Sequence, residues 1–98
     1  MKLTQFDMSK YLDSDEAIEE YLDQVLADGD NAEFIRAIGY IAKAKGMSAI
    51  SKDTGLGRES LYKAFNGDAS PRFDTVMKVM RSLGIKLHIQ ICDKKVAV

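Results

Sequence analysis

The chain has 98 residues, which is the length of one compact domain and is too short for the two-domain layout of most enzymes that bind large cofactors. Hydrophobic residues make up 46% of it and charged residues 30%, a balance that excludes a disordered or low-complexity chain. The net charge is -1, which by itself argues against nucleic acid as a partner.

The charge is divided unevenly along the chain. Residues 1–30 carry two lysines and nine Asp or Glu, a net charge of -7, whereas residues 31–98 carry twelve Lys or Arg and six Asp or Glu, a net charge of +6. We expect an acidic N-terminal segment and helix at 1–30, a basic helical body at 31–84, and a C-terminal strand and tail at 85–98. Each half can attract a partner of opposite charge, or both charged surfaces simply face solvent.

Glycines separate the predicted elements. Five of them each follow a helix-like run, where a residue with left-handed backbone can end a helix at no steric cost. Together with the apolar periodicity, this spacing predicts five short helices and an all-α fold. The five glycines are Gly29, Gly46, Gly55, Gly67 and Gly84.

The first predicted helix begins near Asp13, whose carboxylate can accept from free backbone N–H groups while Glu16 reaches back in a capping-box arrangement. This helix is expected to be amphipathic, with one apolar stripe and one acidic face. The stripe is Ile18, Tyr21, Leu22, Val25 and Leu26, and the acidic face is Glu16, Glu19, Glu20 and Asp23.

The second predicted helix uses the same device, with Asp30 as its cap and Glu33 three residues later, and it ends at Gly46. Gly39 lies inside this helix and costs about 1 kcal/mol relative to alanine. Either another backbone approaches closely at Gly39, or the position is an unconstrained one on the surface. The expected apolar stripe is Phe34, Ile35, Ile38, Ile41 and Ala42.

Two very short helices follow, at about 48–54 and 58–66, and the three residues between them give the spacing of a helix-turn-helix. Ser48 is the expected cap of the first. Gly55 can adopt the positive φ that a tight turn needs, and Leu56 is expected to enter the core between the two helices. In the second helix the inward face is Leu61, Ala64 and Phe65.

A fifth helix is predicted at about 73–83, after a loop that holds the only proline. Residues 85–91 then alternate apolar and polar side chains with the period of a half-buried strand, a rhythm found nowhere else in the chain. A strand without a partner leaves backbone N–H and C=O groups unpaired, so we expect it to pair with the same strand of a second copy, unless it is a frayed tail. The inward residues of the helix are expected to be Phe73, Val76, Met77, Met80 and Leu83.

The polar face of the fourth predicted helix carries residue types that read DNA. An α-helix fits the major groove, and the planar donors of Arg58 suit a bidentate contact to guanine. Glu59 can accept from cytosine N4, and Ser60 suits a phosphate. Tyr62 can stack on a thymine methyl or bond a phosphate, and Lys63 attracts the backbone. As alternatives, Glu59 and Lys63 can form a helix-surface ion pair, and Tyr62 can lie flat against a neighbour.

Further positive residues flank this helix. Ser48, Lys52 and Arg72 are candidates for phosphates beside the groove, since the first helix of such a motif crosses the DNA backbone. Lys43 and Lys45 can add to the attraction, although any one of these lysines can equally be solvated.

The run from Ala44 to Gly67, AKGMSAISKDTGLGRESLYKAFNG, together with SPRFDTV at 70–76 and Leu-Gly at 83–84, resembles the Cro/C1 (lambda-repressor-like) helix-turn-helix. More narrowly, the chain is similar to the "probable addiction module antidote" family, antitoxins akin to HigA, which also open with an acidic segment like that at 13–22. The resemblance spans roughly residues 6–91. It implies a homodimer that binds a palindromic operator, represses its own operon and neutralises a RelE/ParE-like toxin.

Two features depart from the wider phage-repressor pattern. Met47 and Ser48 stand where a DNA-contacting glutamine is common, which puts glutamine-type base reading from that helix in doubt. Ser51 stands where alanine is usual, and its hydroxyl costs little if it finds a backbone carbonyl.

The sequence gives little support to catalysis, and it predicts no cofactor or metal. His88 and Cys92 fall four residues apart on the polar face of the predicted strand, but this spacing alone does not create a nucleophile pair. The carboxylates of the first helix suit a solvated face better than a metal site, and no glycine-rich phosphate loop is present. A single cysteine excludes an internal disulfide, and the short apolar runs favour a cytoplasmic protein without a membrane partner.

These patterns and the resemblance together favour a DNA-binding antitoxin that is not an enzyme, with operator DNA, a toxin and a second copy as its partners. Two alternatives stay open. One is a stand-alone phage-type repressor, and the other is a toxin-binding module with little DNA binding.

Overall fold

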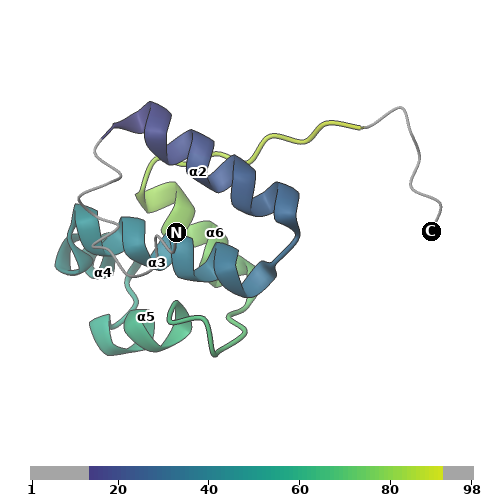
Figure 1. Cartoon of the computed structure of the whole chain (residues 1–98). Helices are drawn as coiled ribbons and strands as arrows, with labels where there is room; N and C mark the ends of the chain where they lie inside the picture. Colours follow the sequence, from purple (N-terminus) through teal and green to yellow (C-terminus); the bar gives the residue numbers. More distant parts are fainter. Residues whose placement is uncertain (1–13, 92–98) are drawn as a thin grey trace.

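The computed structural model describes residues 14–91, which form five α-helices and no β-strand (Figure 1). The predicted all-α fold with five helices is confirmed for these residues. Helix α2 packs on α3, which also contacts α4 and α6, and α4 contacts both α5 and α6. No helix of this part is long and apolar enough to cross a membrane. The helices are α2 (Asp15–Asp28), α3 (Asn31–Lys45), α4 (Met47–Thr54), α5 (Arg58–Ala64) and α6 (Phe73–Ser82).

One apolar core joins all five helices. Ile18 and Leu22 of α2 belong to the same buried cluster as the central residues of α3 and α6. The contrast between the acidic α2 and the basic helices after it is therefore a difference of surface charge and not a division of the core. The largest fully buried side chains are Ile38, Ile41, Leu61, Val79 and Met80.

Two residues predicted to face the core lie at the surface instead. Leu26 is 47% exposed and Phe73 is 72% exposed. Leu26 lies in the last turn of α2 and Phe73 opens α6, so each is at a helix end, where periodicity assigns a face but cannot tell whether a neighbour covers it. Val79, absent from the predicted stripe of α6, is fully buried and follows Val76 at the i, i+3 spacing.

The cap residue predicted for α3, Asp30, is confirmed, and the cap residue predicted for α2 is wrong. Asp30 caps α3, since its Oδ1 accepts from the backbone N–H of Glu33 at 3.1 Å. At α2 the cap is Ser14 and not Asp13, because the Ser14 hydroxyl accepts from the N–H of Ala17 at 3.1 Å. Asp13 itself lies outside the described residues.

The predicted start of α4 is also wrong. The helix begins at Met47, one residue before Ser48, and Ser48 makes no capping bond. Gly46 ends α3 and begins α4 at once, so no position is left for a side-chain cap between them.

The helix ends agree with the glycines only in part. All five glycines predicted to end helices have positive φ, from 78° to 111°. Helix α5 stops at Ala64 rather than at residue 66, and α6 stops at Ser82 rather than at residue 83. Their C-caps are Phe65 and Leu83, so Gly84 directly follows the cap of α6, whereas Gly67 lies two residues beyond the cap of α5.

Side-chain hydrogen bonds hold the turn between α4 and α5. Gly55 ends α4 with φ of 80°, as predicted. The Ser51 hydroxyl donates to the carbonyl of Leu56 at 2.6 Å. Thr54 Oγ1 accepts from the N–H of Leu56 at 3.2 Å and donates to the carbonyl of Ile50 at 2.8 Å. These bonds fix Leu56 with its side chain partly buried against the core. The Ser51 hydroxyl is hydrogen-bonded to a backbone carbonyl, so serine costs little at this position.

Gly39 marks a close approach of two backbones. A Cβ built on Gly39 would lie 2.6 Å from the carbonyl oxygen of Phe65, so a larger residue cannot fit without a shift of the chain. Gly39 is buried, which settles the choice between a close approach and an unconstrained surface position.

The strand predicted at 85–91 is not formed in the described chain. Residues 85–88 pass beside α2, and the rest of the segment leaves the helices without regular structure (Figure 1). It forms one backbone hydrogen bond with the described residues, from the N–H of Ile85 to the carbonyl of Met80 at 2.8 Å. A β-strand needs a neighbouring strand to pair with, and residues 14–91 offer none.

Candidate nucleic-acid interface

Helix α5 presents a polar face to solvent. Leu61 and Phe65 are 1% and 5% exposed and hold the helix against the core from behind. The predicted DNA-contacting residues of this helix are all exposed and therefore available to a partner. They are Arg58, Glu59, Ser60, Tyr62 and Lys63.

The structure decides against one structural alternative for this face and supports the other in part. Glu59 and Lys63 form no ion pair, since the ion pair found among residues 14–91 joins Arg72 and Asp74. Tyr62 is 41% exposed and borders a shallow depression together with Tyr40 and Lys43. The ring is thus neither buried nor fully open to solvent.

The candidates for phosphate contacts come from two other elements. Ser48 and Lys52 are exposed on α4, and Lys43 and Lys45 are exposed at the end of α3.

Arg72 stands just before α6, with its side chain 83% exposed. Its Nε donates to Asp74 Oδ1 at 3.2 Å. Such an exposed pair contributes about 0.2–1 kcal/mol, so a phosphate can compete for the guanidinium.

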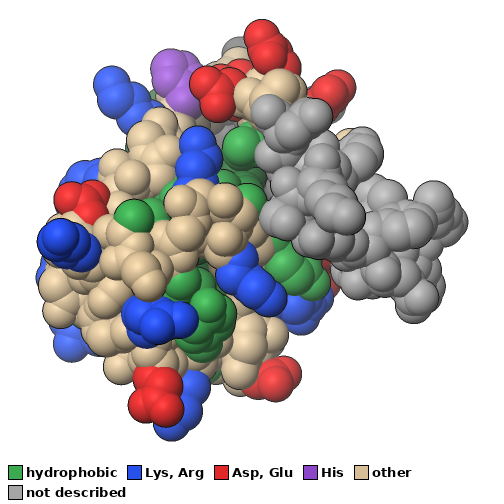
Figure 2. All heavy atoms as spheres, turned by 90° about the vertical axis from the view of Figure 1, so that its left-hand side faces the viewer, with side chains coloured by type: hydrophobic (Ala, Val, Ile, Leu, Met, Phe, Trp, Pro, Cys, Tyr) green, Lys and Arg blue, Asp and Glu red, His purple; other side chains and the backbone are tan. Residues whose placement is uncertain are grey.

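The face with α4 and the start of α5 is rich in positive charge. Figure 2 shows Lys and Arg side chains spread across it, with hydrophobic side chains between them and most acidic groups at the margins. Over the described chain, residues 31–91 carry ten Lys or Arg against five Asp or Glu, whereas residues 14–30 carry seven Asp or Glu and no Lys or Arg. A basic face of this kind attracts polyanions despite the net charge of the whole chain.

Two surface features were not predicted from the sequence. One is the exposed ring of Phe73, which adjoins Arg72 and which the helical pattern had placed in the core. Its position directly after Pro71-Arg72, as the first residue of a helix, is the signal that could have indicated exposure. The other is a groove beside α2, formed by residues far apart in the chain.

The described residues show no arrangement suited to catalysis. Residues 14–91 hold no cluster of His, Cys, Asp or Glu able to bind a metal ion. Burial raises the pKa of Tyr21, and the nearby Glu33 and Tyr40 raise it further, while Arg36 opposes them. Tyr21 therefore stays a neutral phenol at physiological pH. His88 is exposed, and Cys92 lies outside the described part of the chain.

A small helical fold with an exposed basic face and an acidic helix is typical of proteins that bind charged partners. The chain belongs to the family described as "Probable addiction module antidote protein", whose model matches residues 2–91. It is 46% identical over 90 residues to an uncharacterized protein of Haemophilus influenzae, an alignment that covers 91% of this chain and 92% of that one. No solved structure matches the chain significantly. As an antidote of an addiction module the protein is an antitoxin and not an enzyme, and it has a toxin as its partner.

Proposed function

We propose that this antitoxin belongs to a type II toxin–antitoxin module, acts in the cytoplasm, binds operator DNA as a homodimer and represses its own operon. Its toxin is of the RelE/ParE-like kind. Helices α4 and α5 act as a helix-turn-helix of the Cro/C1 type, and residues 31–84 form the DNA-binding body. The observation that carries the proposal is the outer face of α5, where every predicted contact residue is exposed on a helix held by a buried leucine.

The order of the elements supports this role for α5. It follows α4 after a turn of three residues, Gly55 to Gly57. Three hydrogen bonds hold this turn in place, and they are donated by the hydroxyls of Ser51 and Thr54 and by the N–H of Leu56. A rigid turn presents the second helix to the major groove at a fixed angle. Arg58 then reads a base edge, while Lys52 and Arg72 bind the phosphates beside it.

The C-terminal segment supports the homodimer. Ile89 and Ile91 are 86% and 87% exposed, although their side chains are among the most apolar in the chain. Among residues 14–91, the backbone of this segment forms the single hydrogen bond from the N–H of Ile85 to the carbonyl of Met80. We propose that 85–91 pairs with its counterpart in a second copy, which covers both features and sets two α5 helices into successive major grooves about 34 Å apart.

Titration of the operator duplex upstream of the gene tests the DNA-binding role. In fluorescence anisotropy, Arg58→Ala is expected to weaken binding about tenfold or more, because a bidentate contact to guanine contributes roughly 1–3 kcal/mol. The matched control is Arg81→Ala, which removes the same charge from an exposed position on α6. Wild-type affinity should fall steeply as salt rises, because phosphate contacts release counterions.

Equal effects of the two substitutions would show that Arg58 contributes charge alone. If the wild-type chain binds no duplex above nonspecific levels, the DNA-binding role is wrong and a toxin-binding module remains. The family assignment already favours the antitoxin over a stand-alone phage-type repressor.

A further inference from the structure

A continuous groove runs along α2. Two adjoining depressions, of about 510 and 270 Å³, share Glu19, Leu22, Ile85 and Lys86 among their lining residues. One wall is α2, and the other is the segment 83–88 that follows α6. We call this feature the α2 groove.

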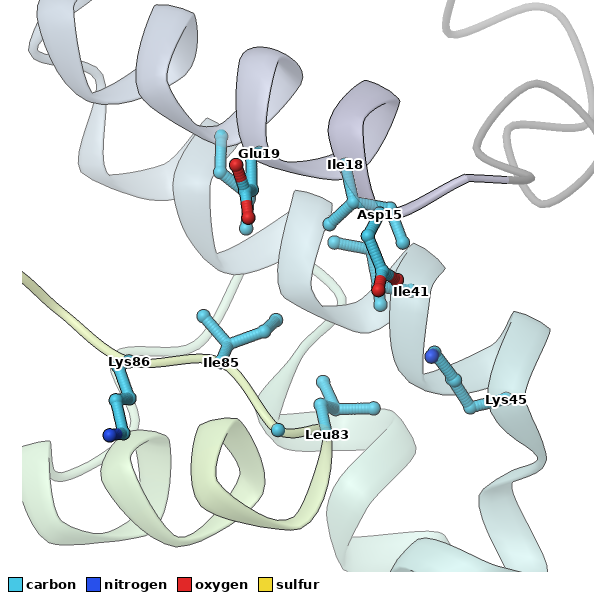
Figure 3. Close-up of a pocket in the computed structure, with 10 residues that line it drawn as sticks. Asp15, Ile18, Glu19, Ile41, Lys45, Leu83, Ile85 and Lys86 are labelled. Atoms are coloured by element: carbon cyan, nitrogen blue, oxygen red, sulfur yellow. The ribbon is translucent and has the colours of Figure 1, made fainter.

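The floor of the α2 groove is apolar and its α2 rim is acidic. Asp15 and Glu19 extend from α2 beside Ile18, on the side of the groove opposite Ile85, as Figure 3 shows. Asp23 continues the rim one turn further along. The floor is completed by Leu22, Leu26, Phe34, Met80, Leu83 and Leu87.

A lysine and a histidine lie at the edges of the groove, and a second lysine belongs to its far wall. Lys45 stands at one end, and His88 lines the second depression. Lys86 belongs to the opposite wall and points away from α2 (Figure 3). The acidic rim thus lies along one wall only, so an occupant must place its positive charges on one side.

The carboxylates of α2 lack partners within the described chain. This helix has six Asp or Glu and no Lys or Arg, and none of the six forms an ion pair with another residue of 14–91. Like charges at i, i+4, such as Asp15 with Glu19 and Glu19 with Asp23, destabilise a helix by about 0.2–0.5 kcal/mol per pair. Asp28 adds a further cost at the negative end of the helix dipole. A charge pattern that weakens the isolated fold indicates a surface adapted to a positively charged partner.

We infer that the α2 groove is the docking site for the toxin, and that it takes an amphipathic toxin segment with aliphatic and basic side chains. The aliphatic side chains enter the floor, and lysines or arginines meet Asp15, Glu19 and Asp23. This inference rests on the proposed function, because it assigns a surface to the proposed toxin. The segment 85–91 of a second copy fits the rim poorly, since Lys86 is its one Lys or Arg.

The test compares two double substitutions that change the charge equally. Glu19→Gln with Asp23→Asn neutralises the rim of the groove, and Glu16→Gln with Glu20→Gln neutralises two exposed carboxylates of α2 that do not line it. Binding of each full-length chain to the purified toxin encoded in the same operon is measured by isothermal titration calorimetry. We expect about tenfold weaker binding for the rim variant and less than about threefold for the control, with the difference shrinking as salt rises.

A third variant tests the floor. Leu26→Glu places a charge on an exposed residue of the groove, and Ala27→Glu places the same charge on its exposed neighbour outside the groove. The groove is the docking site if Leu26→Glu weakens toxin binding at least about tenfold more than Ala27→Glu does. Operator binding of every variant serves as the check that the fold is intact.

The outcomes separate this inference from the proposed function. If the wild-type chain does not bind the toxin, the proposed partner is wrong. If the wild-type chain binds and the rim and control variants lose affinity equally, the groove assignment is overturned while the antitoxin role stands. Weakened self-association of the Leu26→Glu variant without weaker toxin binding would also overturn it, in favour of a second copy as the occupant.

Discussion

At two positions of this fold, a nearby backbone carbonyl oxygen determines which residue fits. Gly39 has the Phe65 carbonyl oxygen 2.6 Å from where its Cβ would lie, and the Ser51 hydroxyl donates to the Leu56 carbonyl at 2.6 Å. The sequence raised both positions as questions, because a mid-helix glycine and a serine in place of alanine break local patterns. The outcome at each position depends on where another stretch of backbone lies in the fold. The periodicity of the sequence does not predict that.

Gly39→Ala is therefore expected to destabilise the protein, although the same exchange in an open helix gains about 1 kcal/mol. Overpacking against a backbone atom costs roughly 1–3 kcal/mol, so after this gain we expect a net loss of up to about 2 kcal/mol in the free energy of unfolding. Urea unfolding followed by circular dichroism measures it. The control Ala44→Gly, at an exposed site of α3, should lose about 1 kcal/mol through propensity alone. A Gly39→Ala variant about 1 kcal/mol more stable than the wild type would contradict the close approach.

At the scale of elements, the five helices could be predicted because apolar periodicity and glycines agree on where each lies. The starts of α3, α5 and α6 were predicted correctly. Those of α2 and α4 could not be predicted, because Asp13 and Ser14, or Met47 and Ser48, are chemically plausible neighbours and only the backbone geometry chooses between them. Exposure of Phe73 was missed for a similar reason, since the first turn of α6 extends beyond the cover of the other helices.

The C-terminal segment shows a different limit. Apolar and polar residues do alternate in this segment, but a β-strand forms only when it pairs with a second strand. Residues 14–91 contain no other strand. The dimer proposal assigns that partner to a second copy.

Ile89→Lys is therefore expected to weaken self-association about tenfold or more, because burying one isoleucine contributes roughly 1.5–3 kcal/mol. Gln90→Lys adds the same charge to the next residue, on the opposite face of the paired strands, and should change self-association much less. Sedimentation equilibrium over a concentration series measures both dissociation constants. Equal weakening by both substitutions, or a monomeric wild type, would count against strand pairing.

At the scale of the whole molecule, opposite charges lie on different sides of the fold. In Figure 1, α2 lies at the top and α5 at the bottom, with α3 between them. The outer face of α5 could be predicted from sequence because its residues are consecutive. The α2 groove could not, since it combines residues of α2, α3 and 83–88 that only the fold brings together. The separation of the two surfaces implies that toxin and operator can bind at the same time.

Amide hydrogen exchange of the full-length antitoxin, measured alone, with its operator duplex and with its toxin, tests this account most directly. We expect the duplex to protect α4 and α5, and the toxin to protect α2 and the segment 83–88, with both patterns present when both partners are added. If the operator instead protects α2, or leaves the amides of α5 exchanging as in the free chain, the basic face is not the DNA-binding surface.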